Sequence, residues 1–204
     1  LTEAGPNNFV IDAEVAMVKK GAIGKSMLFN EVQVINENGE LCKQGEVGEL
    51  CIKGSHVFLN YWNNDEETKK TFHNGWLKTG DLARIDEEGD FYIVGRKKEM
   101  IITGGENVYP QEVEQCLISV PVVEAVSVIC VPDEKWGECV VAFIVSKQAS
   151  AELEQILKAT CKEHLANFKV PKRFYFIEEL PKTVVGKINK QQLAEIAKEH
   201  IEIN

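Results

Sequence analysis

The pattern of predicted secondary structure changes near residues 95–98, and this change limits the folds that the chain can adopt more than any other feature. Before it, short alternating runs such as Glu31–Ile35 are separated by tight turns, among them Asn36–Gly39 and Asp86–Asp90. Alternating runs joined by short glycine-containing turns are typical of β-hairpins. Residues 1–97 are therefore predicted to form a small antiparallel, barrel-like sheet. Strands are expected at Glu31–Ile35, Val47–Lys53, Trp76–Lys78, Leu82–Ile85 and Phe91–Val94, a short helix at Glu66–Phe72, and loops over residues 1–26.

After this point, strand-like and helix-like segments alternate. Pro110 suits the first turn of a helix, and Ser150 can cap a second helix whose apolar residues recur at helical spacing. Residues 98–204 are therefore predicted to form an α+β domain, separate from residues 1–97. Its expected strands are Glu99–Thr103, Val122–Val131, Glu138–Val145 and Arg173–Ile177, with a last helix at Lys190–Ile201.

Charge and cysteine usage exclude several classes of function. The 204 residues include 23 Lys and Arg against 32 Asp and Glu, a formal net charge of −9, which argues against non-specific nucleic-acid binding. No stretch approaches the roughly 18 uncharged apolar residues of a transmembrane helix. The six cysteines form no CxxC pair, so we expect buried, reduced thiols in a cytoplasmic protein.

Four motifs contain residues that could bind a ligand or take part in catalysis. Each of them also has a purely structural interpretation. Asp81 follows a Thr-Gly turn and can accept hydrogen bonds from two vicinal hydroxyls, or bond only its own turn. Arg96 begins a basic run that suits anionic acceptors, or is a solvated charge run. Thr103–Pro110 is a glycine turn before a helix; either its backbone lets a ligand approach closely, or the turn has only a structural role. Lys187 lies in a loop after a glycine, where it can reach a developing negative charge or remain a surface lysine.

The order and spacing of these motifs resemble the adenylate-forming superfamily, which includes acyl-CoA synthetases, luciferases and the adenylation domains of peptide synthetases. The resemblance covers nearly the whole chain. It rests on Leu1–Glu3, Gly45–Glu49, Asn60–Trp62, Gly75–Asp81, Gly95-Arg96, Gly104–Glu114, Lys135–Glu138, Phe168–Pro171 and Pro181–Ile188.

This resemblance implies a two-step reaction. A carboxylate attacks the α-phosphate of ATP to give acyl-AMP and pyrophosphate, and a thiol, usually that of coenzyme A, then displaces AMP. It also implies that residues 1–97 are the β-rich C-terminal part of a large AMP-binding domain, and that residues 98–204 are the small C-terminal lid domain.

Residue roles follow from the resemblance at matching positions. Thr2 resembles the family's threonine that contacts the AMP phosphate, and Glu3 resembles the glutamate that helps to hold Mg²⁺. Asp81 resembles the ribose-binding aspartate, and Arg96 a second ribose or phosphate contact. Lys187 resembles the lysine that bridges the carboxylate and the α-phosphate during adenylation.

The resemblance also implies a conformational change. Lys98 matches the hinge about which the lid domain rotates between the two half-reactions. In one state the lid delivers the lysine loop, and in the other it presents Gly104 and Gly105, which line the tunnel for the pantetheine of coenzyme A.

The parent enzyme is expected to be a bacterial fatty-acyl or aryl-acid CoA ligase, with a long- or medium-chain fatty acid favoured. The phosphate-gripping loop and the acyl pocket that relatives carry upstream of Leu1 are absent, so we expect a C-terminal piece that is inactive alone and whose partner is the missing N-terminal domain. The alternatives are an adenylation unit that acts with a carrier protein, and a non-catalytic lid-like module. The oligomeric state stays open, with a homo-oligomer among the alternatives.

Overall fold

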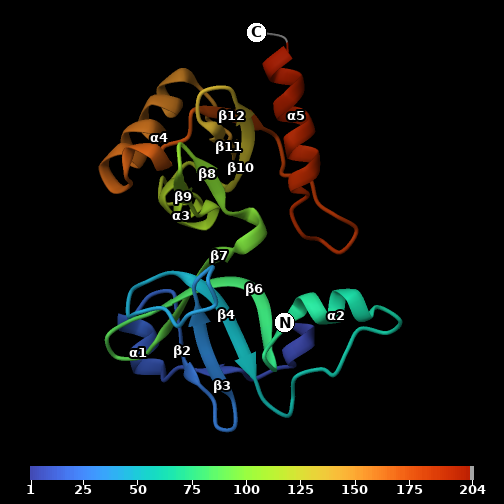
Figure 1. Ribbon diagram of the computed structural model, residues 1–204. Coiled ribbons are helices and arrows are strands. Elements are labelled where there is room, and N and C mark those ends of the chain that lie inside the picture. Colours follow the sequence, from blue (N-terminus) through green and yellow to red (C-terminus); the bar gives the residue numbers. More distant parts are fainter. Residues whose placement is uncertain (203–204) are drawn as a thin grey trace. The chain divides into compact units, whose positions relative to one another are not determined.

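Two separate sheets organise the chain, one in the unit Leu1–Lys98 and one in the unit Glu99–Asn204 (Figure 1). The computed structural model describes the backbone of residues 1–202 and the side chains of residues 1–199. Within these residues, no helix is both long and apolar enough to cross a bilayer.

The first unit holds a seven-stranded sheet whose strand pairs are all antiparallel, as predicted from its alternating runs and tight turns. The strands follow the order β1-β2-β7-β6-β4-β3, and β5 pairs with β6. They are β1 (Phe9–Val10), β2 (Ala22–Ser26), β3 (Glu31–Ile35), β4 (Gly48–Lys53), β5 (Phe72–His73), β6 (Trp76–Ile85) and β7 (Phe91–Arg96). The helices are α1 (Ala13–Val18) and α2 (Asp65–Thr71), with 3-10 turns at Thr2–Ala4 and Lys97–Glu99.

Two predictions for this unit were wrong. The segment expected to be loops contains β1, α1 and β2, which are too short to show a clear periodicity. A Cβ on Gly24 would clash with the carbonyl oxygen of Val10, so the pairing of β1 with β2 depends on a close backbone approach. In addition, the two strands expected on either side of Thr79-Gly80 form one strand, β6.

The second unit holds a five-stranded sheet with helices on both faces. The strands follow the order β10-β11-β8-β9, and β12 pairs with β11 in parallel. They are β8 (Ile101–Thr103), β9 (Glu106–Val108), β10 (Ala125–Asp133), β11 (Gly137–Val145) and β12 (Arg173–Ile177). The helices are α3 (Pro110–Ile118), α4 (Ala151–His164) and α5 (Lys190–Glu202), with a 3-10 turn at Asn167–Lys169. This mixture of elements confirms the predicted α+β class.

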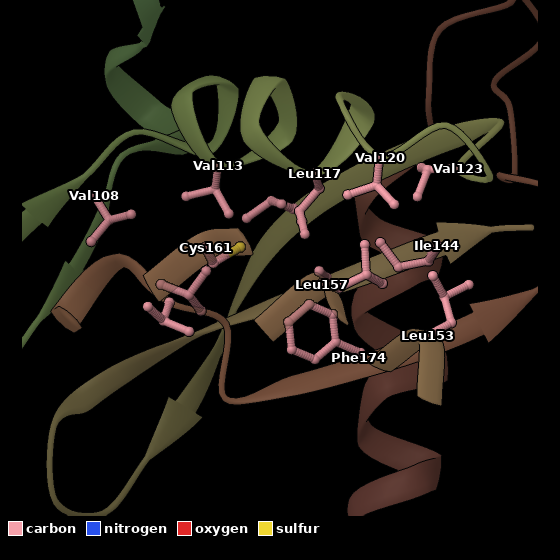
Figure 2. Close-up of a cluster of buried hydrophobic side chains, with 14 of the residues drawn as sticks. Val108, Val113, Leu117, Val120, Val123, Ile144, Leu153, Leu157, Cys161 and Phe174 are labelled. Atoms are coloured by element: carbon pink, nitrogen blue, oxygen red, sulfur yellow. The ribbon is translucent and has the colours of Figure 1, made fainter. Parts of the chain in front are cut away.

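Strand alternation gives this sheet two separate cores. Successive side chains of a strand point to opposite faces. In β11, Val140, Ala142 and Ile144 belong to a cluster that includes Leu117 and Leu157 from α3 and α4 (Figure 2). The intervening residues of β11 belong to a second cluster with α5; they are Cys139, Val141 and Phe143. Because both faces are covered, β10 and β11 are nearly continuous apolar runs rather than alternating ones.

Candidate active site

A bulge in β6 sets the position of Asp81. Glu49 pairs with Leu82 and Cys51 pairs with Lys78, so Leu50 alone faces three residues of β6. Gly80, at the centre of the three, has a φ of +71°, a conformation that costs other residues free energy. The buried hydroxyl of Thr79 donates to the carbonyl oxygen of Leu50 (2.8 Å) and accepts from the Asp81 amide (3.1 Å). Thr79-Gly80 is thus a rigid bulge within a strand, not the predicted turn between strands.

Asp81 and Arg96 form a cross-strand pair. They face one another in the register of β6 and β7, and the Arg96 Nε lies 2.9 Å from Asp81 Oδ1. Burial raises the pKa of the Asp81 carboxyl above its ordinary value, and the Arg96 guanidinium opposes that rise. Arg96 Nη1 also donates to the Thr79 carbonyl oxygen (3.4 Å). The second carboxylate oxygen of Asp81 can accept from a sugar hydroxyl, and the remaining Arg96 donors can bind a hydroxyl or an anion.

Glu3 is held by a tyrosine that is distant in sequence. The Tyr61 hydroxyl donates to Glu3 Oε1 (2.8 Å), and the Phe58 amide donates to the Glu3 carbonyl oxygen (2.8 Å). Hydrogen bonds from the Glu3 amide and from Tyr61 lower the pKa of the Glu3 carboxyl, so it is ionised at neutral pH. Thr2 lies in the same 3-10 turn and is exposed.

An open pocket of about 570 Å³ lies against these residues, and every residue that lines it belongs to the first unit. Glu3, Tyr61, Thr79 and Gly80 contribute to its wall, whereas Thr2 and Asp81 do not. Its basic side chains outnumber its three acidic ones, which suits an anionic ligand. The basic residues are Lys70, Lys78, Arg96, Lys97 and Lys98.

The basic run Arg96-Lys97-Lys98 is not a uniformly solvated stretch. Arg96 binds Asp81, and the Lys97 Nζ lies 2.8 Å from Oε2 of the buried Glu49. Within the described side chains, Lys98 has neither a hydrogen bond nor an ion pair and is exposed. The three neighbours therefore have three different environments.

Gly104 and Gly105 form the two-residue turn of a hairpin between β8 and β9. Thr103 pairs with Glu106, and the two glycines have φ angles of +59° and +86°, as a type I′ turn requires. The Gly104 amide donates to the Trp136 carbonyl oxygen (2.9 Å), and a Cβ on Gly104 would lie 2.7 Å from the Trp136 ring. Strand β9 was missing from the sequence prediction, which assigned these glycines to a turn directly before a helix.

Lys187 lies on a small, hydrogen-bonded loop in the second unit. The Thr183 amide donates to the Lys187 carbonyl oxygen (2.7 Å), and the Gly186 amide donates to the Thr183 carbonyl oxygen (2.8 Å). Val184, Val185 and Lys187 are exposed at its tip. The loop therefore presents a cation on an ordered backbone.

The structure thus brings some of the predicted site residues together and leaves others apart. Arg96, Lys98 and Glu3 line one pocket. Asp81 does not line it but forms an ion pair with Arg96, which does. Gly104, Gly105 and Lys187 belong to the other unit. Sequence reasoning missed Tyr61, Thr79 and Glu49 as site residues. Tyr61 lies inside the motif Asn60–Trp62, but nothing in the sequence indicates its contact with Glu3 across 58 positions.

The described side chains of the first unit could hold a metal ion only if phosphate groups of a bound substrate supplied further ligands. Among the described residues, no three His, Cys, Asp or Glu side chains gather into a metal-binding set. Mg²⁺ commonly uses one or two carboxylates and takes its other ligands from water and substrate phosphates. The ionised Glu3 at the pocket wall is compatible with that arrangement.

Two family models match the chain. The model of the AMP-binding enzyme matches residues 1–62, and that of the AMP-binding enzyme C-terminal domain matches residues 112–187. Among curated proteins, the chain is 43% identical over 195 residues to the long-chain-fatty-acid–CoA ligase FadD13 of Mycobacterium tuberculosis. The match covers 96% of this chain and 38% of the ligase. The chain therefore spans less than half the length of this relative.

Solved structures agree with this match. The o-succinylbenzoate CoA synthetase MenE of Bacillus subtilis, in complex with the acyl-adenylate OSB-AMP, matches with a TM-score of 0.88 and 36% identity. The match covers 95% of this chain and 39% of MenE. The same enzyme in complex with ATP and magnesium matches with a TM-score of 0.85 and 35% identity over 95% of this chain and 40% of that one.

Proposed function

Because this chain belongs to the adenylate-forming superfamily of AMP-binding enzymes, we propose that it is the C-terminal portion of an ATP-dependent acid–thiol ligase. The proposed enzyme forms an acyl-adenylate from ATP and a carboxylic acid, then transfers the acyl group to coenzyme A. Support comes from matches over nearly the whole chain to FadD13, which is named as a CoA ligase, and to MenE, which is named as a CoA synthetase.

The observation that carries this proposal is the Asp81–Arg96 pair beside the basic pocket of the first unit. A carboxylate fixed by a neighbouring guanidinium is a suitable acceptor for the two hydroxyls of a ribose, and Arg96 can donate to a hydroxyl or a phosphate. The Thr79-Gly80 bulge holds this carboxylate without a flexible loop. In this proposal, Asp81 and Arg96 bind the nucleoside and Thr2 contacts its α-phosphate.

Glu3 is proposed to hold Mg²⁺ jointly with the phosphates of ATP. A bound Mg²⁺ neutralises charge that develops on the phosphate oxygens. Tyr61 and the backbone keep Glu3 ionised and fix its carboxylate, which is the form that the ion requires.

Lys187 is proposed to act in the first half-reaction. The attacking carboxylate and the α-phosphate are both anions that repel one another. A cation between them lowers the barrier, provided that its interaction strengthens as charge shifts in the transition state. The loop at Thr183–Lys187 supports this role because it exposes Lys187 while its backbone is hydrogen-bonded.

We propose a fatty acid as the acid substrate and the Gly104-Gly105 turn as part of the tunnel for coenzyme A. FadD13 is named as a long-chain-fatty-acid ligase and shares 43% identity, whereas MenE is named for succinylbenzoate and shares 36%. The Trp136 ring occupies the side-chain position of Gly104, but nothing lies within 4 Å of a Cβ on Gly105, so a thin chain such as pantetheine can approach the backbone of the turn there. The six free cysteines support a reducing, cytoplasmic compartment.

The test substitutes Lys187 in the full-length enzyme of this proposal. Lys187→Ala is expected to slow ATP–pyrophosphate exchange with a fatty acid by about 10²–10³-fold, the usual effect of removing one group that stabilises transition-state charge. Thioester formation from supplied acyl-AMP and coenzyme A is expected to remain. Equal losses in the two half-reactions would contradict the assigned role.

Two controls accompany this measurement. Lys182→Ala removes an exposed lysine from the base of the same loop and is expected to leave both half-reactions unchanged. The 204-residue chain alone is expected to give no exchange, since no Gly/Ser/Thr/Lys-rich phosphate loop occurs in it. Turnover by the chain alone would contradict the need for a further domain.

A further inference from the structure

Two cysteine thiols meet where α3 packs against α4 in the second unit. The Cys116 thiol donates to the carbonyl oxygen of Thr160 (3.8 Å), the residue directly before Cys161. The Cys116 side chain also packs against the apolar cluster to which Cys161 belongs. Cys161 lies on the side of α4 that faces α3 (Figure 2), and the two thiols interact with one another. A covalent bond between them would join the two helices that cover this face of the sheet.

The two thiols differ in their access to solvent. Cys116 is half-buried, whereas Cys161 is fully buried. A small reagent can therefore reach Cys116 but cannot reach Cys161 directly. An accessible thiol next to a second thiol that can resolve its oxidised form is a common arrangement of redox-sensitive cysteines.

The contact between the thiols also determines which of them ionises first. Burial raises the pKa of the Cys116 thiol, and a hydrogen bond from Cys161 opposes that rise. Burial raises the pKa of the Cys161 thiol to about 12, and the charge of an ionised Cys116 adds to this rise. The thiolate is the nucleophilic form of cysteine, so Cys116 is the thiol that attacks first. Because both pKa values are raised, the attack is slow at neutral pH.

We propose that Cys116 and Cys161 form a site of thiol–disulfide exchange whose substrate is a small disulfide such as glutathione disulfide. Cys116 loses its proton to solvent and attacks one sulfur of glutathione disulfide, so that a mixed disulfide forms and one glutathione leaves as a thiolate. Cys161 then gives up its proton and attacks the Cys116 sulfur, which releases the second glutathione. The two protein thiols are oxidised to a disulfide, and the glutathione disulfide is reduced to two glutathione molecules that take up two protons.

The product is an internal disulfide that stabilises the second unit. The two cysteines are roughly 45 positions apart, and a cross-link over such a loop restricts the unfolded chain. Disulfides in cytosolic proteins are usually transient and redox-sensing rather than permanent. The cross-link is therefore expected to form under oxidising conditions and to be removed by reducing thiols.

Another pair of cysteines in the same sheet provides a matched control. Cys130 on β10 faces Val140 in the register, and Cys139 on β11 faces Val131. Cys130 packs against the cluster that includes α3 and α4, whereas Cys139 belongs to the cluster with α5. Because their side chains point to opposite faces of the sheet, these two thiols cannot form a disulfide although their strands are adjacent.

The site is tested on the 204-residue chain by incubation with glutathione disulfide near neutral pH. The chain is then unfolded, its remaining thiols are alkylated with iodoacetamide, and it is cleaved with trypsin at the lysines between the two cysteines. Peptide masses should show a disulfide between Cys116 and Cys161 that dithiothreitol removes, with Cys130 and Cys139 alkylated. Complete alkylation of Cys161, or a Cys130–Cys139 disulfide in equal yield, would overturn the proposal.

Three substitutions separate the roles of the two thiols. Cys161→Ala should stop the reaction at the mixed disulfide, with one glutathione retained on Cys116. Cys116→Ala should retain no glutathione and form no cross-link, because the remaining thiol at Cys161 is fully buried. Cys139→Ala removes another buried thiol of the same unit and should cross-link in the same yield as the unsubstituted chain. Glutathione bound to Cys161 in the Cys116→Ala chain would contradict the order of the two steps.

The stabilising effect of the disulfide is measured separately. Oxidation should raise the thermal midpoint of the second unit by roughly 10 °C, because the cross-link removes conformational freedom from the unfolded chain. The Cys161→Ala chain should show no such rise after the same treatment. An unchanged midpoint in the cross-linked chain would overturn the stabilising role, even where the peptide masses confirm the exchange site.

Discussion

At the scale of single residues, two buried hydroxyls have opposite surroundings. Thr79 is 7% exposed, and its hydroxyl both donates to Leu50 and accepts from Asp81. Ser127 in β10 is 0% exposed, and its hydroxyl has no hydrogen-bond partner in the described part of the chain. A buried polar group is unfavourable unless it is hydrogen-bonded, so these two residues should contribute to stability with opposite signs.

This contrast predicts the effects of removing each hydroxyl. Ser127→Ala is expected to leave the free energy of unfolding unchanged or raise it by about 1 kcal/mol, because an unsatisfied group is lost. Thr79→Val is expected to lower it by about 1–3 kcal/mol, since the Leu50 carbonyl and the Asp81 amide lose their partner. Urea unfolding of both variants measures the difference. A marked loss of stability in Ser127→Ala would show that its hydroxyl is satisfied.

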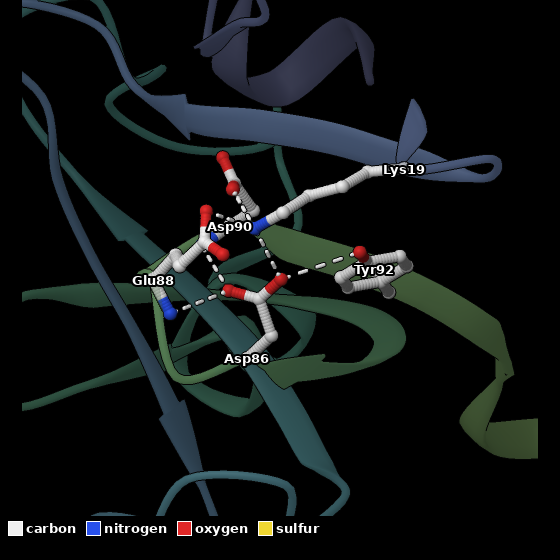
Figure 3. A network of polar contacts seen from close by, with 5 residues as sticks. All are labelled: Lys19, Asp86, Glu88, Asp90 and Tyr92. Atoms are coloured by element: carbon white, nitrogen blue, oxygen red, sulfur yellow. Dashed lines mark hydrogen bonds and ion pairs between the residues drawn. The ribbon is translucent and has the colours of Figure 1, made fainter. Parts of the chain in front are cut away.

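At the scale of elements, one lysine ties the end of α1 to the turn between β6 and β7 (Figure 3). The Lys19 Nζ lies 2.7 Å from Asp86, 2.9 Å from Glu88 and 2.5 Å from Asp90. The Asp86 carboxylate also accepts from the amides of Glu88 and Asp90, which form the turn. The hydrogen bond from Lys19 lowers the pKa of Asp86 to about 2, and the bonds to Asp86 and Asp90 raise that of Lys19.

This network predicts a defined acid sensitivity. The pKa of Asp86 is lower in the folded state than its ordinary value of 3.8. Its contribution to stability is therefore complete above pH 4 or so and is lost as the pH falls toward about 2. The difference in thermal midpoint between the unsubstituted chain and Asp86→Asn should be constant near neutral pH and shrink over that window.

The control for this measurement is an exposed ion pair of the same unit. Glu31 and Lys53 lie 3.0 Å apart, with side chains that are 61% and 44% exposed. Glu31→Gln is expected to shift the midpoint little at any pH, because exposed pairs contribute little. A difference for Asp86→Asn that did not change between pH 4 and 2 would contradict the role of its ionised form.

Elements with strong local patterns could be predicted from the sequence, and those with weak patterns could not. The strands at Glu31–Ile35 and Arg173–Ile177 have the predicted bounds, and Ser150 caps α4 as expected, with its hydroxyl accepting from the Leu153 amide. The short helix Ala13–Val18 was missed, since its six residues include no buried side chain and so no apolar stripe.

At the scale of the whole molecule, each unit has its own hydrophobic core. In the first unit, Leu77 and Ile52 form a cluster with Ala4, and a second cluster surrounds Phe91. In the second unit, Leu157 is fully buried in the cluster between the sheet and α3 and α4. A unit with its own core can open or unfold separately from its neighbour.

Core substitutions are therefore expected to act within one unit. Leu157→Ala should lower the stability of the second unit by about 2–5 kcal/mol. Hydrogen exchange should accelerate in β10 and β11 and stay unchanged in β4 and β6. The matched variant Leu77→Ala, at a residue that is 1% exposed, should give the reverse pattern. Equal acceleration in both sheets after either substitution would show that the units unfold as one.

The strongly patterned elements, the α+β class and the motifs that point to the family could all be predicted from sequence, because each is encoded in residues close together in the chain. Which distant side chains meet depends on the folded chain and could not be predicted. Glu3 meets Tyr61 across 58 positions and Glu49 meets Lys97 across 48. Strand register sets the direction of Glu49 in β4, where a shift of one residue would turn its side chain to the other face of the sheet. Glu3, in a 3-10 turn, meets Tyr61 because the chain between them folds back on itself, which no local pattern encodes.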